Sequence, residues 1–167
     1  MKNRSANILI VALLLLVMMS VILIVFLEKA HEEFPENITV EANGVTESIL
    51  PIRDLRLTPT EAQEYSVNLM CEASGSYYIF LDYEETVDGG MKPFVDVTIT
   101  CGDLVVYTGS LEDLFKEDNI LQFEGNLESK EKPPLVLTFR YEMPHHVGNE
   151  AQGTYSDFDV YIKIKKS

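Results

Sequence analysis

The stretch VDVTITCGDLVVYTG, residues 95–109, contains the pattern that decides the fold. Apolar and polar side chains alternate from Val95 to Cys101, and a period of two indicates a half-buried β-strand. The dipeptide Gly102-Asp103 interrupts the alternation, and the apolar residues after it predict a second strand. We therefore expect two antiparallel strands joined by a two-residue turn.

A two-residue turn at Gly102-Asp103 also predicts which side chains lie opposite each other. Counting back from the turn places Cys101 opposite Leu104 and Ile99 opposite Val106. All four side chains then face the core, because strand residues two apart share one face.

The same alternation recurs along the rest of the chain beyond residue 37. It is found in the segments Tyr65–Cys71, Ile79–Tyr83, Leu135–Tyr141 and Phe158–Ile164. Asn43-Gly44 suits a type I′ turn and predicts a further hairpin, whereas LEDLFK (111–116) is the only segment that favours a helical turn. About eight or nine short strands with turns at this spacing predict an all-β sandwich. Composition does not distinguish a jelly-roll order of strands from an immunoglobulin-like one.

A second decisive stretch is ILIVALLLLVMMSVILIVFL, residues 8–27, which has no charge and one polar side chain, Ser20. A helix of this length covers about 30 Å, the thickness of a bilayer's hydrocarbon core. Lys2 and Arg4 precede the run, so the positive-inside rule predicts a cytoplasmic amino terminus. We expect residues 1–7 in the cytoplasm, a signal-anchor helix over 8–27, a linker over 28–36 and one extracellular domain over 37–167.

A cleaved secretory signal is the alternative interpretation of the apolar run. Secretory signals have an apolar region of about 7 to 15 residues that ends at small residues spaced as in A-x-A. The run here is longer and ends in Phe26-Leu27-Glu28-Lys29. Length and exit sequence therefore favour retention as an anchor.

The chain is acidic, with 27 Asp and Glu against 13 Lys and Arg and a formal net charge of −14. This charge disfavours nucleic acid and anionic lipid headgroups as partners. Basic partners and divalent cations stay open, although no Asp/Glu run matches a calcium loop. The simplest interpretation is that dispersed carboxylates keep the domain soluble.

The two cysteines, Cys71 and Cys101, both fall on the core-facing side of their predicted strands. In an oxidising compartment they can form one disulfide, or they can stay unpaired as small buried hydrophobes. The sequence does not say whether their Cα atoms come within about 7 Å, the limit for a bridge. Both alternatives stay open at this point.

Catalytic motifs are absent: the sequence has no HExxH, GxSxG, Walker or Rossmann pattern. The only candidates for metal ligands are His145, His146 and Glu150. Adjacent histidines on an extended chain point to opposite sides, which makes a poor chelate. We therefore expect no enzyme activity, no cofactor and no metal, and an exposed loop at these residues.

Several short segments together resemble the TasA and camelysin group of exported proteins of Gram-positive bacteria. They are scattered between residues 55 and 165: LTPTE (57–61), YSV (65–67), SGSY (74–77), LDYE (81–84), YEMP (141–144), VGNEAQG (147–153) and FDV (158–160). The resemblance implies a jelly-roll-like sandwich at the cell surface, with matrix or fibre subunits among its relatives that share strands between neighbours. It implies no catalytic signature, and no ligand set here matches the metallopeptidase label sometimes attached to camelysin.

The most specific part of the resemblance is the turn that contains Gly148, Asn149, Glu150 and Gly153. We expect a structural role, because glycine permits backbone angles closed to other residues and the Asn and Glu side chains can bond nearby backbone groups. The chain departs from fibre-forming members of the group, because their signal is removed whereas the run over 8–27 is expected to stay.

These features predict a non-enzymatic surface protein with a structural, adhesive or matrix-related role. An edge strand can offer unpaired backbone groups to a protein partner or to a second copy. We expect that edge within residues 37–50, because Pro51 cannot donate a hydrogen bond to a central strand. The alternatives are a released biofilm or fibre subunit and, less favoured, a metal-dependent surface hydrolase or sensor.

Overall fold

The computed structural model describes residues 18–19, 35–41, 44–116 and 119–167. The chain divides into two units, Met1–Glu33 and Phe34–Ser167, and the described strands all belong to the second. The expected cytoplasmic segment and the expected membrane segment lie outside the described residues, apart from Met18 and Met19, as does most of the expected linker. No helix within the described ranges has the length and apolar character needed to cross a membrane.

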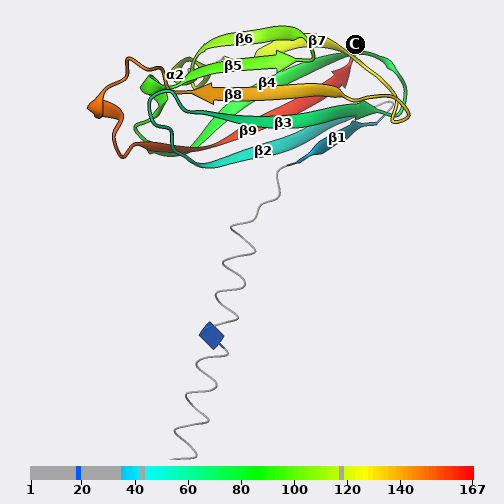
Figure 1. Ribbon diagram of the computed structural model, residues 1–167. Coiled ribbons are helices and arrows are strands. Elements are labelled where there is room, and N and C mark those ends of the chain that lie inside the picture. Colours follow the sequence, from blue (N-terminus) through cyan, green and yellow to red (C-terminus); the bar gives the residue numbers. More distant parts are fainter. Residues whose placement is uncertain (1–17, 20–34, 42–43, 117–118) are drawn as a thin grey trace, which may run out of the picture. The chain divides into compact units, whose positions relative to one another are not determined.

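The second unit is a sandwich of two β-sheets (Figure 1). Its strands are β1 (Asn37–Val40), β2 (Val45–Leu55), β3 (Ala62–Cys71), β4 (Gly75–Gly89), β5 (Asp96–Cys101), β6 (Leu104–Ser110), β7 (Leu121–Leu127), β8 (Leu135–Glu142) and β9 (Tyr155–Lys166). One sheet has the order β1-β3-β8-β5-β6 and the other β2-β9-β4-β7. Neighbouring strands are antiparallel except β1 and β3, which are parallel. The predicted all-β sandwich is confirmed.

The core lies between the sheets, on the faces that the alternation predicts. Along β9 the residues Phe158, Val160, Ile162 and Ile164 are fully buried, and the residues between them are partly or largely exposed. The same holds on β3, β5 and β8. Period-two patterning therefore placed the core correctly on β3, β4, β5, β8 and β9. On β6 the expectation is wrong for Leu104, which was predicted to face the core and is 57% exposed.

The predicted helical turn is also present, as α2 (Leu111–Leu114). The side chain of Ser110 caps it by accepting a hydrogen bond of 3.1 Å from the backbone N–H of Asp113. Leu111 and Leu114 are buried, and Phe115 directly after α2 packs against Tyr83 and Phe158. Two short 3-10 turns that the sequence did not reveal, η1 (Lys92–Phe94) and η2 (Asn149–Ala151), are also present.

The hairpin at Gly102-Asp103 is confirmed, but its predicted register is right only next to the turn. Cys101 lies opposite Leu104, whereas Ile99 lies opposite Tyr107 rather than Val106. A β-bulge between Ile99 and Thr100 adds one residue on the β6 side. Gly102 has a φ of +57°, which suits the first central position of a tight hairpin turn.

The hairpin predicted at Asn43-Gly44 is wrong. The strands on either side of this dipeptide, β1 and β2, belong to different sheets: β1 pairs with β3, and β2 pairs with β9. Ile38 and Val40 of β1 are buried in the core. Burial of the β1 side chains beside β3 therefore outweighs the local turn preference.

The sandwich has two distinct ends, which the pairing of β5 with β8 identifies. At one end Asp96 lies opposite Glu142, next to the connection from β8 to β9. At the other end Cys101 lies opposite Leu137, next to the turn between β5 and β6. In Figure 1 the β8–β9 connection and the β5–β6 turn accordingly lie at opposite ends of the sandwich. We call them the loop end and the hairpin end.

Two tyrosines are buried in the core near the loop end. The hydroxyl oxygens of Tyr83 and Tyr141 lie 3.3 Å apart and form a buried hydrogen bond. Burial raises the pKa of both phenols, so both keep their protons at neutral pH. The rings of Tyr141 and Phe158 are 5.6 Å apart at an angle of 66°, which joins the two sheets.

We expect Tyr83→Phe and Tyr141→Phe each to lower the free energy of unfolding by about 1–3 kcal/mol, because each leaves one buried hydroxyl without its partner. The double variant should cost less than the sum of the two single variants, since it removes both hydroxyls. Denaturant unfolding followed by tyrosine circular dichroism measures all three. Additive effects would show that the two hydroxyls do not interact.

Candidate functional site

Two connections meet at the loop end and are joined through their backbones. One connects β2 to β3 and contains Leu57–Glu61; the other connects β8 to β9 and contains Met143–Thr154. The N–H of Thr60 donates to the carbonyl of Met143 at 2.9 Å, and the N–H of Met143 donates to the carbonyl of Glu61 at 3.0 Å. Reciprocal bonds of this kind hold both connections in one arrangement.

The first connection is strained and is held by a carboxylate. Thr60 has a φ of +76°, which is rare for a β-branched residue. Next to it, the Glu61 carboxylate accepts the backbone N–H of Thr58 at 2.7 Å. Hydrogen bonding from Thr58 lowers the pKa of Glu61 below its ordinary value. The charged form of Glu61 therefore stabilises the turn at neutral pH.

Between the two connections lies a pocket of about 480 Å³, which we call the end pocket. Its floor consists of the buried side chains Leu57, Met143, Val147 and Ala151. Its rim is polar and includes Arg56, Asn149, Gln152 and Thr154. An apolar floor with few polar groups around it is the usual character of a binding pocket.

Arg56 is the cation of this rim. Its Nε donates to Asp54 at 2.6 Å, and its guanidinium carbon lies 5.2 Å above the centre of the Tyr155 ring. These two contacts fix the direction of the side chain. An anionic group on a partner would therefore meet a positioned guanidinium.

The predicted structural turn forms the far wall of the end pocket. Glu150 accepts the backbone N–H of Gly148 at 3.0 Å, which lowers the pKa of its carboxyl, and Asn149 bonds Gln152 through its main-chain carbonyl at 3.0 Å. Gly153 has a φ of +79°, as expected for a position that needs glycine. Gly148 differs from the expectation, because its φ of −96° is open to other residues.

The structure does not gather the candidate metal ligands into a site. His145 and His146 are exposed, and their rings are 5.9 Å apart at an angle of 89°. The Glu150 carboxylate is engaged with Gly148. In the part of the chain that the structure describes, no three His, Cys, Asp or Glu side chains are placed to hold a metal ion.

His145 also lines a second hollow of about 480 Å³ at the same end, together with Asp96 and Glu142. The Glu142 carboxylate is paired with Arg140 at 2.8 Å and is therefore not free to activate the imidazole.

The two cysteines are buried and are not joined by a disulfide, so of the two alternatives the structure shows the unpaired thiols. Cys71 is on β3 and Cys101 on β5, and β8 lies between these strands. Cys101 is opposite Leu137, which is itself opposite Val67, four residues before Cys71. One intervening strand and four residues separate the thiols by much more than the roughly 7 Å that a disulfide spans.

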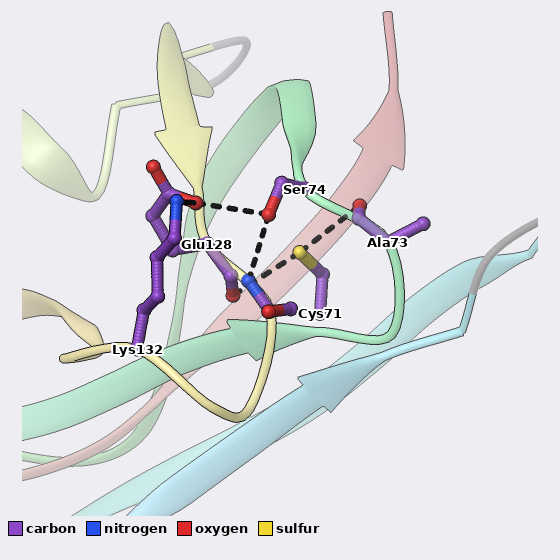
Figure 2. A network of polar contacts seen from close by, with 6 residues as sticks. Cys71, Ala73, Ser74, Glu128 and Lys132 are labelled. Atoms are coloured by element: carbon purple, nitrogen blue, oxygen red, sulfur yellow. Dashed lines mark hydrogen bonds and ion pairs between the residues drawn. The ribbon is translucent and has the colours of Figure 1, made fainter.

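Each thiol has a packing role. The Cys71 thiol donates to the carbonyls of Ala73 (3.2 Å) and Glu128 (3.3 Å), within the network that Figure 2 shows. In the same network Ser74 donates to the Glu128 carboxylate at 2.9 Å and accepts the N–H of Ser129 at 3.0 Å. Burial raises the pKa of Cys101 to about 11, so its thiol is a poor nucleophile at neutral pH.

Sequence reasoning identified one wall of the end pocket and missed the other. The glycines marked the turn 148–153. Residues Leu57–Glu61 were noted only as part of the family resemblance and contain no chemical motif. In the sequence, the signal for an apolar floor is that Val147 and Ala151 stand among polar neighbours; the structure buries both. The stretch that contains them is too short to show a hydrophobic period.

Comparison with known proteins adds no assignment. No family model matches the chain, and no curated protein matches it. One similar solved structure is PliG of Aeromonas hydrophila, a periplasmic inhibitor of g-type lysozyme, with 8% identity, a TM-score of 0.35 and coverage of 78% of this chain and 99% of that one. Another is the infectious bursal disease virus VP2 subviral particle, with 15% identity, a TM-score of 0.34 and coverage of 72% and 33%. Likeness at this level assigns no function.

The Glu61–Thr58 bond predicts a local pH dependence. The pKa of Glu61 is lower in the folded chain than its ordinary value of 4.5, so the bond contributes fully above that pH and is lost as the pH falls through the lowered value. We expect the amide of Thr58 to lose hydrogen-exchange protection only as the pH falls below 4.5, through the lowered pKa of Glu61. In Glu61→Gln its protection should not change over this range. Equal pH profiles for the two proteins would contradict the assignment.

Proposed function

We propose that the chain is a single-pass membrane protein of the cell surface, with its amino terminus in the cytoplasm and its β-sandwich outside. Its role is structural, adhesive or matrix-related rather than enzymatic. The apolar run over residues 8–27, the absence of a catalytic motif and the resemblance to TasA and camelysin support this proposal.

We propose further that the sandwich is a jelly roll. From β2 onward the chain moves to the other sheet at every connection except that from β5 to β6. Repeated passage between two antiparallel sheets is characteristic of the double Greek key of jelly rolls. The strand order thus supports the same group resemblance, independently of the motifs.

The observation that carries the functional proposal is an incomplete sheet edge. β1 pairs with only the last four residues of β3, Asn68–Cys71. Within the described residues, the stretch Ala62–Val67 of β3 has β8 as its only neighbour. β2 is the edge of the other sheet on the same side and contains Pro51, which agrees with the predicted edge position. This side offers backbone groups for strand addition by a protein partner.

Hydrogen bonds identify which β1 residues face outward. The carbonyl of Glu36 accepts from Asn68 at 3.0 Å, and the carbonyl of Val40 accepts from Glu72 at 3.2 Å. In an extended strand the backbone N–H and C=O groups of successive residues point to opposite sides. The backbone groups of Asn37 and Thr39 therefore point away from β3, toward an incoming strand.

We expect Thr39→Pro to weaken association about tenfold or more, because it removes an outward N–H while leaving the bonds to β3 in place. Cross-linking of the full chain on intact Gram-positive cells measures this. The control is Thr39→Ala, which keeps the N–H and should behave like the wild type. Equal cross-linking of the proline and alanine variants would exclude this edge.

The membrane assignment makes a separate prediction. The full chain, expressed in a Gram-positive host, should be recovered from the membrane with its amino terminus intact, because the apolar run lacks a cleavage site. Intact mass and amino-terminal sequencing of membrane and released fractions test this. A released product cut near residue 30 would contradict the anchored protein and support the alternative, a released matrix or fibre subunit.

A further inference from the structure

The outer face of the sheet β2-β9-β4-β7 carries most of the exposed apolar side chains of the sandwich. Within residues 35–41, 44–116 and 119–167, seven large apolar side chains are exposed, and four of them belong to this face or adjoin it: Val45, Ile49, Tyr78 and Ile120. In the same ranges none lies on β3, β5 or β8 of the other sheet. Gathering of exposed apolar side chains on one face marks a surface that binds a partner.

The strand register places two aromatic rings of this face next to each other. Phe80 of β4 lies opposite Lys163 of β9, and the next outward position pairs Asp82 with Tyr161. Phe80 and Tyr161 are therefore diagonal neighbours, a separation that aromatic side chains bridge. Phe80 is half-buried, yet the described side chains that pack against the core do not include it. Its ring therefore belongs to the outer face.

The two rings line a hollow of about 360 Å³, which we call the face hollow. Its other lining residues are one aliphatic residue, one lysine and three carboxylates: Ile120, Lys163, Glu47, Asp82 and Glu84. Three carboxylates against one lysine leave the hollow with a formal charge of −2. The hollow is therefore complementary to a cation.

Neighbours within the chain compensate this negative charge only in part. Lys163 and Glu47 are 3.8 Å apart and both about half exposed, so their ion pair is weak. Hydrogen bonding with Glu84 raises the pKa of the Tyr161 phenol, so Glu84 already has a partner. Asp82 is exposed, and its carboxylate makes no hydrogen bond or ion pair in the described part. Asp82 is thus the carboxylate that is open to an incoming cation.

Rings beside a carboxylate favour one kind of cation. A guanidinium stacks on an aromatic ring and donates two parallel hydrogen bonds to a carboxylate, whereas an ammonium is a compact and strongly hydrated charge. The apolar side chains around the hollow suit apolar neighbours of that arginine in a protein partner. With a formal net charge of −14, the chain also attracts basic partners, which the sequence left open.

We propose that the face hollow receives an arginine side chain of a partner protein, stacked on Phe80 and Tyr161 and paired with Asp82. Ile49 and Ile120 contact the apolar residues on either side of this arginine. The contact uses neither β1 nor β3. It therefore goes beyond the proposed strand addition and does not depend on it.

The test uses the full chain in phosphatidylcholine nanodiscs and three peptides of five residues with blocked ends. Each peptide has leucine on both sides of its central residue, which is arginine, lysine or citrulline, the uncharged isostere of arginine. Ligand-observed NMR gives the dissociation constants, with empty nanodiscs as the blank. The arginine peptide should bind about tenfold or more tightly than the citrulline peptide and more tightly than the lysine peptide. Its affinity should fall as salt is raised.

Two variants and one matched control locate the contact. Asp82→Asn should weaken binding of the arginine peptide about fivefold, because it removes the open carboxylate. Phe80→Leu keeps an apolar side chain but removes the ring, so the preference for arginine over lysine should shrink. The control is Asp103→Asn, which removes the same charge from the exposed turn between β5 and β6 of the other sheet and should bind like the wild type.

Four results would overturn the proposal. They are equal affinity for the arginine and citrulline peptides, equal affinity for the arginine and lysine peptides, equal losses in Asp82→Asn and Asp103→Asn, and binding of cellotetraose but of no peptide, which would assign the face to sugars. Thr39→Pro should bind the arginine peptide like the wild type, whatever its effect on cross-linking. The strand-addition proposal and this one therefore fail separately.

Discussion

The packing of β8 against β9 across the core is the contact on which the rest of the structure depends. Each strand lies inside its sheet, and the Tyr141 and Phe158 rings touch between them. The chain connects these two strands directly through residues 143–154. The connection must therefore cross from one sheet to the other, and this crossing creates the wall of the end pocket. The position of the end pocket thus follows from the packing of the two sheets and not from a binding motif.

Alternation of side chains predicted β3, β4, β5, β8 and β9, because each of these strands has one face in the core and one face nearer to solvent. It did not reveal pairing. Asn43-Gly44 has the composition of a hairpin turn, yet β1 leaves for β3, because only there do Ile38 and Val40 reach the core. The register of β6 was missed at Val106 because a bulge has no signature in the sequence. Pairing and bulges are decided by contacts between distant residues, which no local pattern encodes.

The candidate site shows the same division between local and distant information. Glycines marked the turn 148–153, but the strained Thr60 and the bond of Glu61 to Thr58 depend on how two connections meet. The two cysteines shared the core-facing side, as predicted, yet β8 separates them. In the described part no three His, Cys, Asp or Glu side chains converge on a metal site, and the proposed role rests instead on the incomplete sheet edge at β1 and β3.

The place of β9 has a consequence for when the domain can form. β9 is the last strand of the chain and lies between β2 and β4, and its Phe158 accepts a hydrogen bond from Arg53, 105 residues earlier. The four-stranded sheet therefore cannot assemble until residues 155–166 have been synthesised. Contacts of such long sequence separation form slowly. A chain built in this order completes its four-stranded sheet only after β9 has been made.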